Sequence, residues 1–306
     1  YLIGRTPSAK ILLKAFAEVK PTVILSVPLI LEKIYKKMIQ PQISKNPVSW
    51  VLKVPLLDQV VLGKIREKLM TAFGGEFSQI IIGGAPLNAE VEAFLRRIKF
   101  PITIGYGMTE TAPLISFTPW TEFRSQSCGQ VLRGFMEARI SNPDADGVGE
   151  IQVRGENVMM GYYKNEQATK ESFTEDGWLR TGDLGTIDED GFIYIKGRCK
   201  TMLLGPSGQN IYPEEIEAKI NNMPYVLESL VLQKEDARLV ALVCPDFEAV
   251  DADKLTQEQL EVAMEENRKL VNQQLAAYEQ VNVFKLYPHE FEKTPKKSIT
   301  RFRYEV

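Results

Sequence analysis

The sequence predicts an α/β protein with a partial parallel βαβ portion, an antiparallel barrel-like portion and a small α+β domain at the end. Up to about residue 112, short β-branched runs alternate with amphipathic helical stretches, as βαβ units do. From 113 to 197, short alternating segments are separated by Gly and Asp clusters, which is typical of antiparallel strands. From 198 to 306, predicted helices and strands occur together in an order that differs from both earlier portions, which indicates a separate small α+β domain.

The first portion begins with a predicted helix over 6–20, in which Thr6 is the N-cap and Pro7 takes the first helical position. A strand is expected at 22–26, followed by a helix at 29–39.

The run 80–82 is a second buried strand, and Asn88 can cap the helix that follows it. The next strand is predicted at 102–104, and the loop after it lies where open α/β sheets bind ligands.

Portions 113–197 and 198–306 contain predicted strands, and the latter also contains two predicted helices. Pro213 opens a helix with acidic residues in its first turn, and Thr256 with Gln259 forms a capping box before a helix expected to end near Tyr278. Strands are predicted at 137–140, 150–154, 192–196, 229–233, 238–244 and 282–287.

Composition excludes several classes of protein. The net charge of −3 over 306 residues gives no electrostatic case for a nucleic-acid partner. No apolar run reaches about 18 residues, so no transmembrane segment is predicted, while peripheral contact with a membrane stays open. Three widely spaced cysteines form no disulfide framework and favour a reducing compartment, and the single His289 excludes a paired-histidine metal site.

Three segments have residue types suited to nucleotide chemistry. In 105–111, two glycines allow close approach of a ligand, Tyr106 can stack on a base, and Glu110 can hold Mg²⁺; an ordinary βα loop is an equal alternative. In 177–183, Asp183 could accept ribose hydroxyls, although Gly-Asp after a strand is also a common turn. The segment 197–217 reads either as a domain hinge or as a hairpin with a helix cap.

The order and spacing of these segments resemble the AMP-forming acyl-CoA synthetase superfamily of adenylate-forming enzymes. Segments 83–87 and 149–155, with 161–163 shortly after, match further motifs of that superfamily in the correct order. The stretch 21–35 is similar to the long-chain fatty acid–CoA ligase branch. The resemblance implies that 1–197 is the C-terminal part of a large adenylate-forming domain, and that 198–306 is a small mobile domain.

The resemblance also implies roles for single residues. Tyr106 would stack on adenine, Thr109 would contact phosphate and Glu110 would ligate Mg²⁺. Lys200 would be the hinge, and Gly208 would line the path of the coenzyme A arm. The implied ATP/AMP contacts are Gly84, Ala85, Pro86, Gly105, Tyr106, Gly107, Met108 and Thr109, with Asp183 and Arg198 on the ribose.

The chemistry implied by the resemblance has two steps and takes ATP with Mg²⁺, a fatty acid and coenzyme A as substrates, with no tightly bound cofactor. The carboxylate attacks the α-phosphate and releases pyrophosphate, and the thiol then expels AMP from the acyl-adenylate. Two alternatives stay open: another acid–thiol ligase, using an aryl acid or a carrier-protein thiol, and a non-catalytic nucleotide-binding homologue. A cytoplasmic location is expected.

Two departures from the family pattern matter. The family's phosphate-binding loop, which is rich in Ser, Thr and Gly and ends in Pro-Lys, has no counterpart in 1–306, so we expect a C-terminal fragment that forms no acyl-adenylate alone. In register with the family's terminal motif, Ser298 stands at the position of the catalytic lysine. Lys297 is the first candidate to replace that lysine, and Lys296 is the next.

Overall fold

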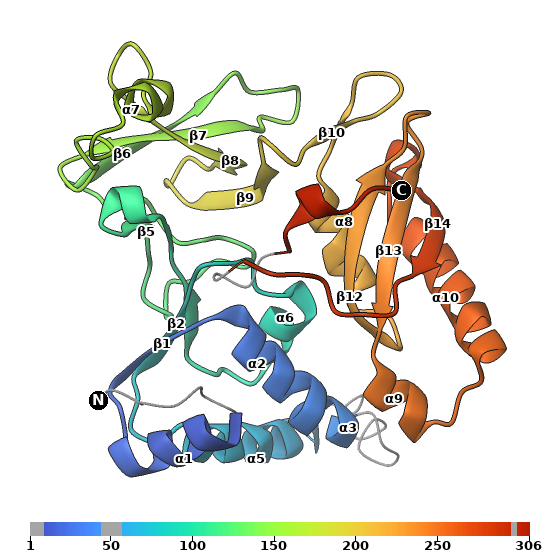
Figure 1. Cartoon of the computed structure of the whole chain (residues 1–306). Coiled ribbons are helices and arrows are strands. Elements are labelled where there is room, and N and C mark those ends of the chain that lie inside the picture. The colour runs from blue at the N-terminus through green and yellow to red at the C-terminus, as the bar shows by residue number, and fades with distance from the viewer. Residues whose placement is uncertain (1–8, 44–56, 295–298) are drawn as a thin grey trace. The chain divides into compact units, whose positions relative to one another are not determined.

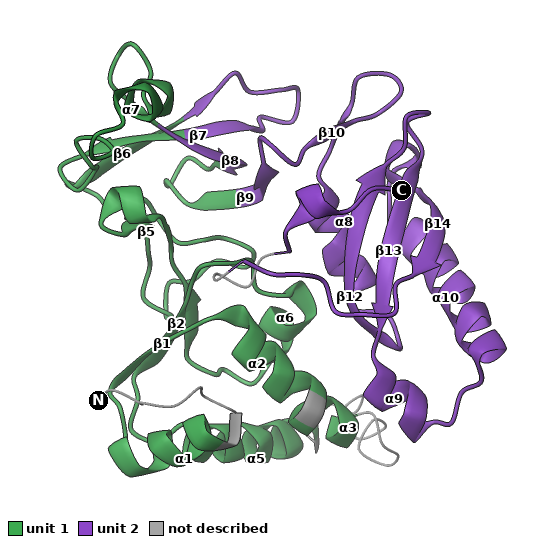
Figure 2. Cartoon of the chain, viewed as in Figure 1, with its two compact units in different colours: residues 1–139, 152–179, 187–194 green, residues 140–151, 180–186, 195–306 purple. Residues whose placement is uncertain are grey.

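The computed structural model describes residues 9–43, 57–294 and 299–306 (Figure 1). Packing divides the chain into two compact units, which Figure 2 shows in two colours. Unit 1 comprises 1–139, 152–179 and 187–194, and unit 2 comprises 140–151, 180–186 and 195–306. The domain boundary expected at residue 198 remains a prediction.

Unit 1 contains the parallel sheet that the alternating pattern predicts. Its strands are β1 (Val23–Ser26), β2 (Gln79–Ile82) and β3 (Ile102–Ile104), in the order β1-β2-β3, and both pairings are parallel. Ile80 and Ile82 point to the same face of the middle strand and are fully buried, while Ile81 on the other face is partly buried.

The helices of unit 1 pack through aromatic side chains. Phe16 on α1 (Ala9–Val19) stacks on Phe73, which directly follows α5 (Leu57–Ala72), with ring centroids 5.5 Å apart. Tyr35 contacts Phe94 on α6 (Ala89–Arg97) at 5.2 Å. The helix expected at 29–39 is α2 (Pro28–Ile34), which continues as the π-helix η1 (Tyr35–Ile39) and then as α3 (Gln40–Ile43).

A four-stranded sheet follows the chain order β6-β7-β8-β9. The described strands form open sheets rather than a closed barrel. Its elements are β6 (Met136–Ser141), β7 (Gly149–Gly155), β8 (Leu179–Ile187) and β9 (Ile193–Arg198), with the short α7 (Glu166–Ser172) between β7 and β8.

The alternative interpretation of the Gly-Asp pair in this sheet is wrong. Gly182 and Asp183 form no turn after a strand, because both residues lie within β8. Leu179 and Thr181 are buried on one side of this strand, so burial extends the strand through the Gly-Asp pair.

Unit 2 holds a three-stranded sheet in which β12 (Val226–Gln233) and β13 (Leu239–Pro245) are antiparallel, while β14 (Val281–Leu286) pairs parallel with β13. Helices α8 (Pro213–Ile220) and α10 (Gln257–Asn272) share a core with it. A second cluster, which includes Leu242, Phe291 and Tyr304, packs the C-terminal segment against the sheet. The remaining elements are β10 (Leu203–Leu204), β11 (Asn210–Ile211), α9 (Phe247–Ala252) and two 3₁₀ turns, Ala277–Glu279 and Arg301–Arg303.

The capping box of α10 is confirmed, since Thr256 and Gln259 bond each other's main-chain N–H groups. The helix ends at Asn272 rather than near Tyr278. Asn272 explains the early end, because its side chain bonds both the N–H and the C=O of Val281 at 2.9 Å and so ties the helix terminus to β14. Within the described ranges, no helix is long and apolar enough to cross a membrane.

Candidate functional site

Two loops of unit 1 leave the carboxyl ends of neighbouring parallel strands. The loop 83–88 follows β2, and the loop 105–111 follows β3. The Gly105 N–H donates to the carbonyl of Ile82 at 2.9 Å, and a Cβ on Gly83 would lie 3.4 Å from the Gly105 carbonyl. The predicted adenine-side segment therefore runs beside the predicted phosphate segment, at the sheet edge where α/β proteins bind ligands.

The first loop is exposed between two fixed ends. Gly84, Ala85 and Pro86 are exposed, and Gly84 has a φ of +86°, which favours glycine. At the far end, the Asn88 side chain accepts from the N–H groups of Glu90 and Val91 and so caps α6, as predicted.

The second loop is tightly folded on itself. A Cβ at Gly107 would lie 1.8 Å from the Pro113 carbonyl oxygen, so only glycine fits there. The buried Thr111 hydroxyl lies 2.9 Å and 3.0 Å from the carbonyl oxygens of Met108 and Pro113. Tyr106 is 8% exposed, while Thr109 is exposed at the start of a 3₁₀ turn, Thr109–Thr111. Adenine stacking by Tyr106 and phosphate contact by Thr109 remain predictions.

Glu110 is the candidate metal ligand, and its surroundings fit Mg²⁺. The Tyr162 hydroxyl donates to Glu110 Oε1 at 2.8 Å, and this bond is the main reason why the pKa of Tyr162 is raised. The described residues hold no cluster of three or more His, Cys, Asp or Glu side chains that could cage a metal. A lone carboxylate suits Mg²⁺, because this ion keeps several waters and usually arrives with substrate phosphates.

Unit 2 brings the two predicted ribose contacts together. Arg198 Nε on β9 lies 3.1 Å from Asp183 Oδ1 on β8. The Asp183 carboxylate is mostly buried, and the Asp183 N–H donates to Thr181 Oγ1, whose hydroxyl in turn donates to the Ile151 carbonyl at 2.7 Å. These bonds fix the main chain of Asp183, while Arg198, which pairs with its carboxylate, is mostly exposed.

The predicted hinge and the coenzyme A residue follow β9. Lys200 is exposed in the turn after that strand. Gly208 lies in the turn between β10 and β11 with a φ of +83°, and a Cβ there would meet nothing within 4 Å. The left-handed backbone alone therefore explains this glycine, and its role toward coenzyme A remains a prediction. Lys296 and Lys297, the candidate terminal lysines, lie outside the described residues.

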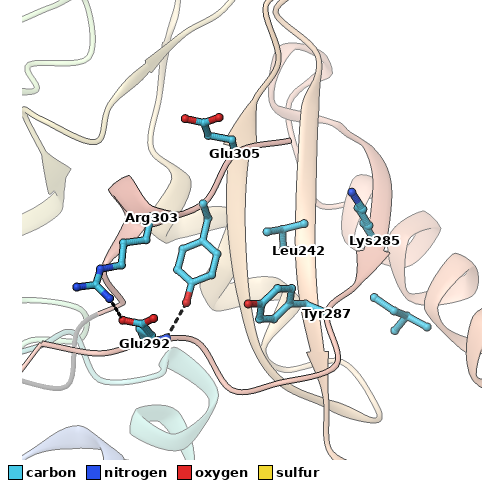
Figure 3. A pocket seen from close by; sticks show the side chains of 8 residues that line it. Leu242, Lys285, Tyr287, Glu292, Arg303 and Glu305 are labelled. Carbon is cyan, nitrogen blue, oxygen red and sulfur yellow. Dashed lines mark hydrogen bonds and ion pairs between the residues drawn. The ribbon is translucent and has the colours of Figure 1, made fainter.

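A cavity of about 340 Å³ opens on unit 2, and its described lining includes none of the predicted site residues that the structure describes (Figure 3). The aromatic rings of Tyr287 and Tyr304 and the aliphatic side chain of Leu242 form part of its lining. Arg303 pairs with Glu292 at its rim, and the Glu292 N–H donates to the Tyr304 hydroxyl at 2.7 Å. These internal bonds make the cavity part of the packing of the C-terminal segment.

Sequence reasoning gave no role to two residues that contact the 105–114 region. The Asn157 amide donates to the carbonyls of Thr111 and Leu114, and Tyr162 donates to Glu110. Tyr162 stands in a segment that matches a family motif, but only the folded chain shows what it touches. Asn157 carries no local signal, because its partners lie more than 40 residues away in sequence.

The parallel sheet with glycine loops at its edge defines an α/β protein, and the residue types of the two units are those predicted to contact a nucleotide. The profile of the family described as "AMP-binding enzyme" matches residues 2–163, and the chain belongs to that family. FadD15 of Mycobacterium tuberculosis, a long-chain-fatty-acid–CoA ligase, is 33% identical over 273 residues, covering 81% of this chain and 44% of its own length. ACSBG2 of Gallus gallus, also named a long-chain-fatty-acid–CoA ligase, is 31% identical over 253 residues, covering 76% of this chain and 33% of its own length.

Solved structures support the fold. ATP-bound MatB from Rhodopseudomonas palustris superposes with a TM-score of 0.69 at 25% identity, over 97% of this chain and 52% of that one. The O-succinylbenzoate coenzyme A synthetase MenE from Bacillus subtilis, in complex with AMP, gives 0.70 at 23% identity, over 98% and 54%. The chain thus spans about half the length, or less, of the proteins it matches.

Proposed function

We propose that the whole protein is an ATP-dependent, AMP-forming ligase that joins a long-chain fatty acid to coenzyme A. The observation that carries the proposal is the 33% identity to a long-chain-fatty-acid–CoA ligase over 81% of the chain. The site geometry supports it, because the glycine loops, Glu110 and the Asp183–Arg198 pair are chemically suited to a magnesium nucleotide. We place this activity in the cytoplasm.

The proposed reaction activates the acid first. The fatty acid carboxylate attacks the α-phosphate of ATP, and the bond to pyrophosphate breaks. The coenzyme A thiol then attacks the acyl carbon, and AMP leaves. Charge grows on phosphate oxygens in the first step, so positioning and cationic stabilisation supply most of the rate.

Three residues of this chain would bear on the first step. Glu110 would hold the Mg²⁺ that accompanies the nucleotide, and Asp183 would fix the ribose. Lys297, or else Lys296, would supply the terminal cation next to the α-phosphate. Alternation of the small domain about Lys200 would let one protein perform both steps.

The test measures AMP release by the whole protein with palmitate, benzoate or no acid, with and without coenzyme A. We expect palmitate to stimulate AMP release with coenzyme A and benzoate to leave it at the level without acid. Stimulation by benzoate instead would favour an aryl-acid ligase, and nucleotide binding with no acid-dependent AMP would favour a non-catalytic homologue.

The chain 1–306 by itself provides a second test. We propose that it forms no acyl-adenylate, because the family's phosphate-binding loop has no counterpart in it. Exchange of labelled pyrophosphate into ATP, measured with palmitate, checks this directly. Exchange above the level without palmitate would show that the chain alone suffices.

A further inference from the structure

We propose that Tyr162 is a positioning residue that fixes the Glu110 carboxylate for the metal ion of the nucleotide. The inference rests on the proposed function, in which Glu110 is a magnesium ligand. It adds that segment 157–162 acts as a clamp on the loop that carries Glu110. All residues of this clamp and its target belong to unit 1.

The clamp first holds the main chain at Glu110 and directly after it. The Met159 N–H donates to the Glu110 carbonyl at 2.8 Å. The Asn157 amide donates to the carbonyls of Thr111 and Leu114 at 2.6 and 2.9 Å. Three bonds from one short segment therefore set the path of the chain from residue 110 to residue 114.

Tyr162 then holds the side chain of the same glutamate. Its hydroxyl donates to Oε1 at 2.8 Å, the distance of an ordinary O–H···O hydrogen bond. A free glutamate side chain samples many rotamers, and one well-directed donor restricts it to a few. Because Tyr162 engages Oε1, Oε2 is the oxygen that would face the metal ion.

Tyr162 can act in this way because its own main chain is held. Its N–H donates to Thr169 Oγ1 on α7 at 2.9 Å, and the Thr169 hydroxyl donates to the Asn165 carbonyl at 2.9 Å. A Cβ on Gly161 would lie 2.7 Å from Thr169 Cγ2, so glycine is needed for this close approach. The first turn of α7 therefore fixes the point from which the tyrosine reaches Glu110.

The competing explanation is that the Tyr162–Glu110 bond only ties two loops together. The two explanations differ in what removal of the hydroxyl changes. A loop tie affects every ligand of the site alike, whereas a positioning role toward the metal affects metal-dependent binding and leaves metal-free binding alone. Outer-shell partners of metal ligands typically contribute 10–100-fold to affinity.

The matched pair of variants is Tyr162→Phe and Tyr163→Phe, in the whole protein. The two tyrosines are neighbours, but Tyr163 is 88% exposed and carries Lys164 over its ring instead of contacting Glu110. Binding of Mn²⁺ in the presence of ATP is followed by the loss of the free Mn²⁺ electron paramagnetic resonance signal. Binding of AMP without metal is followed by calorimetry.

We expect Tyr162→Phe to weaken Mn²⁺ binding in the presence of ATP about 10-fold and to leave AMP binding unchanged. Tyr163→Phe should change neither. In a Glu110→Gln background, Tyr162→Phe should have no further effect, because both changes act through the same carboxylate.

Unchanged Mn²⁺ binding in Tyr162→Phe overturns the proposal, and so does an equal loss of AMP binding. The metal measurement needs neither fatty acid nor coenzyme A. A protein that binds Mn²⁺ with ATP but forms no acyl-coenzyme A would therefore refute the proposed function while the test of Tyr162 still gives its answer.

Discussion

Replacing Arg301 by methionine breaks the most buried ion pair among the described residues of unit 2. Arg301 Nη2 lies 2.6 and 2.5 Å from the two carboxylate oxygens of Glu217 on α8, and Nη1 donates to the Val231 carbonyl at 3.1 Å. Glu217 also accepts the Val231 N–H at 2.7 Å. The side chains are only 19% and 11% exposed, so the pair links the C-terminal segment, α8 and β12 away from water.

The magnitude follows from the charge that is left behind. Two unit charges about 4 Å apart attract by about 4 kcal/mol at an effective dielectric constant of about 20. Removal of one partner from a buried pair typically costs about 3–5 kcal/mol, because the remaining charge is uncompensated. We expect Arg301→Met to lower the free energy of unfolding of unit 2 by about that much at pH 8.

The pH dependence gives the prediction its sign. Burial raises the pKa of Glu217 from 4.5 to about 7, although Arg301 and the Val231 N–H act in the opposite direction. A carboxyl group whose pKa is higher in the folded state than in the unfolded state binds its proton more tightly when folded. The ionised Glu217 side chain therefore lowers the free energy of unfolding by its full amount above a pH of about 7, and by less as the pH falls toward 4.5. Without Arg301 this pKa rises further, and the loss in Arg301→Met should be smaller at pH 5 than at pH 8.

The assay is urea unfolding with hydrogen exchange of the β12 and β13 peptides, at pH 8 and pH 5. Arg303→Met is the matched control, since Arg303 is 55% exposed and should lose less than about 1 kcal/mol. The double variant Glu217→Met with Arg301→Met should recover most of the stability. A loss below about 1 kcal/mol for Arg301→Met at pH 8, or a larger loss at pH 5, would refute this reasoning.

Three further predictions concern single sites. Gly107→Ala should destabilise unit 1 by about 1–3 kcal/mol and weaken AMP binding, because its Cβ would meet the Pro113 carbonyl at 1.8 Å. Gly63→Ala, at an exposed position of α5, should instead stabilise by about 0.5–1 kcal/mol, and chemical unfolding and calorimetry compare the two variants. Ile216→Ala should cost about 2–5 kcal/mol in unit 2, since the side chain is fully buried, and hydrogen exchange of β12 measures the loss. Asn88→Ala should cost about 1 kcal/mol through the lost cap of α6, with chemical unfolding as the readout.

Features that depend on residues close together in the sequence were predicted correctly. The strand at 80–82, the Asn88 cap and the capping box at Thr256 all appear in the structure, because each depends on residues within a few positions of one another. The parallel pairing of β1, β2 and β3 followed from the alternation of strands and helices.

The failures have both local and long-range causes. The helix α5 was not predicted, although Leu62, Ile65 and Leu69 stand at helical spacing, and all three are buried in the core of unit 1. The end of α10 was placed too late, because the side chain of Asn272 finds its partner in β14. Likewise, no local pattern connects Tyr162 to Glu110 across 52 positions.

The residues on either side of Lys296 and Lys297, the two candidate terminal lysines, are held by hydrogen bonds and an ion pair. Lys293 and Ile299 form an antiparallel bridge, and the Thr300 N–H donates to the Glu292 carbonyl at 2.9 Å. Beyond the bridge, Arg301 is held by Glu217. With both flanks fixed, a slip of the flanking register would have to break these bonds. Lys297→Ala and Lys296→Ala in the whole protein therefore test the two candidates one at a time, in a chain whose flanking register is held by these bonds.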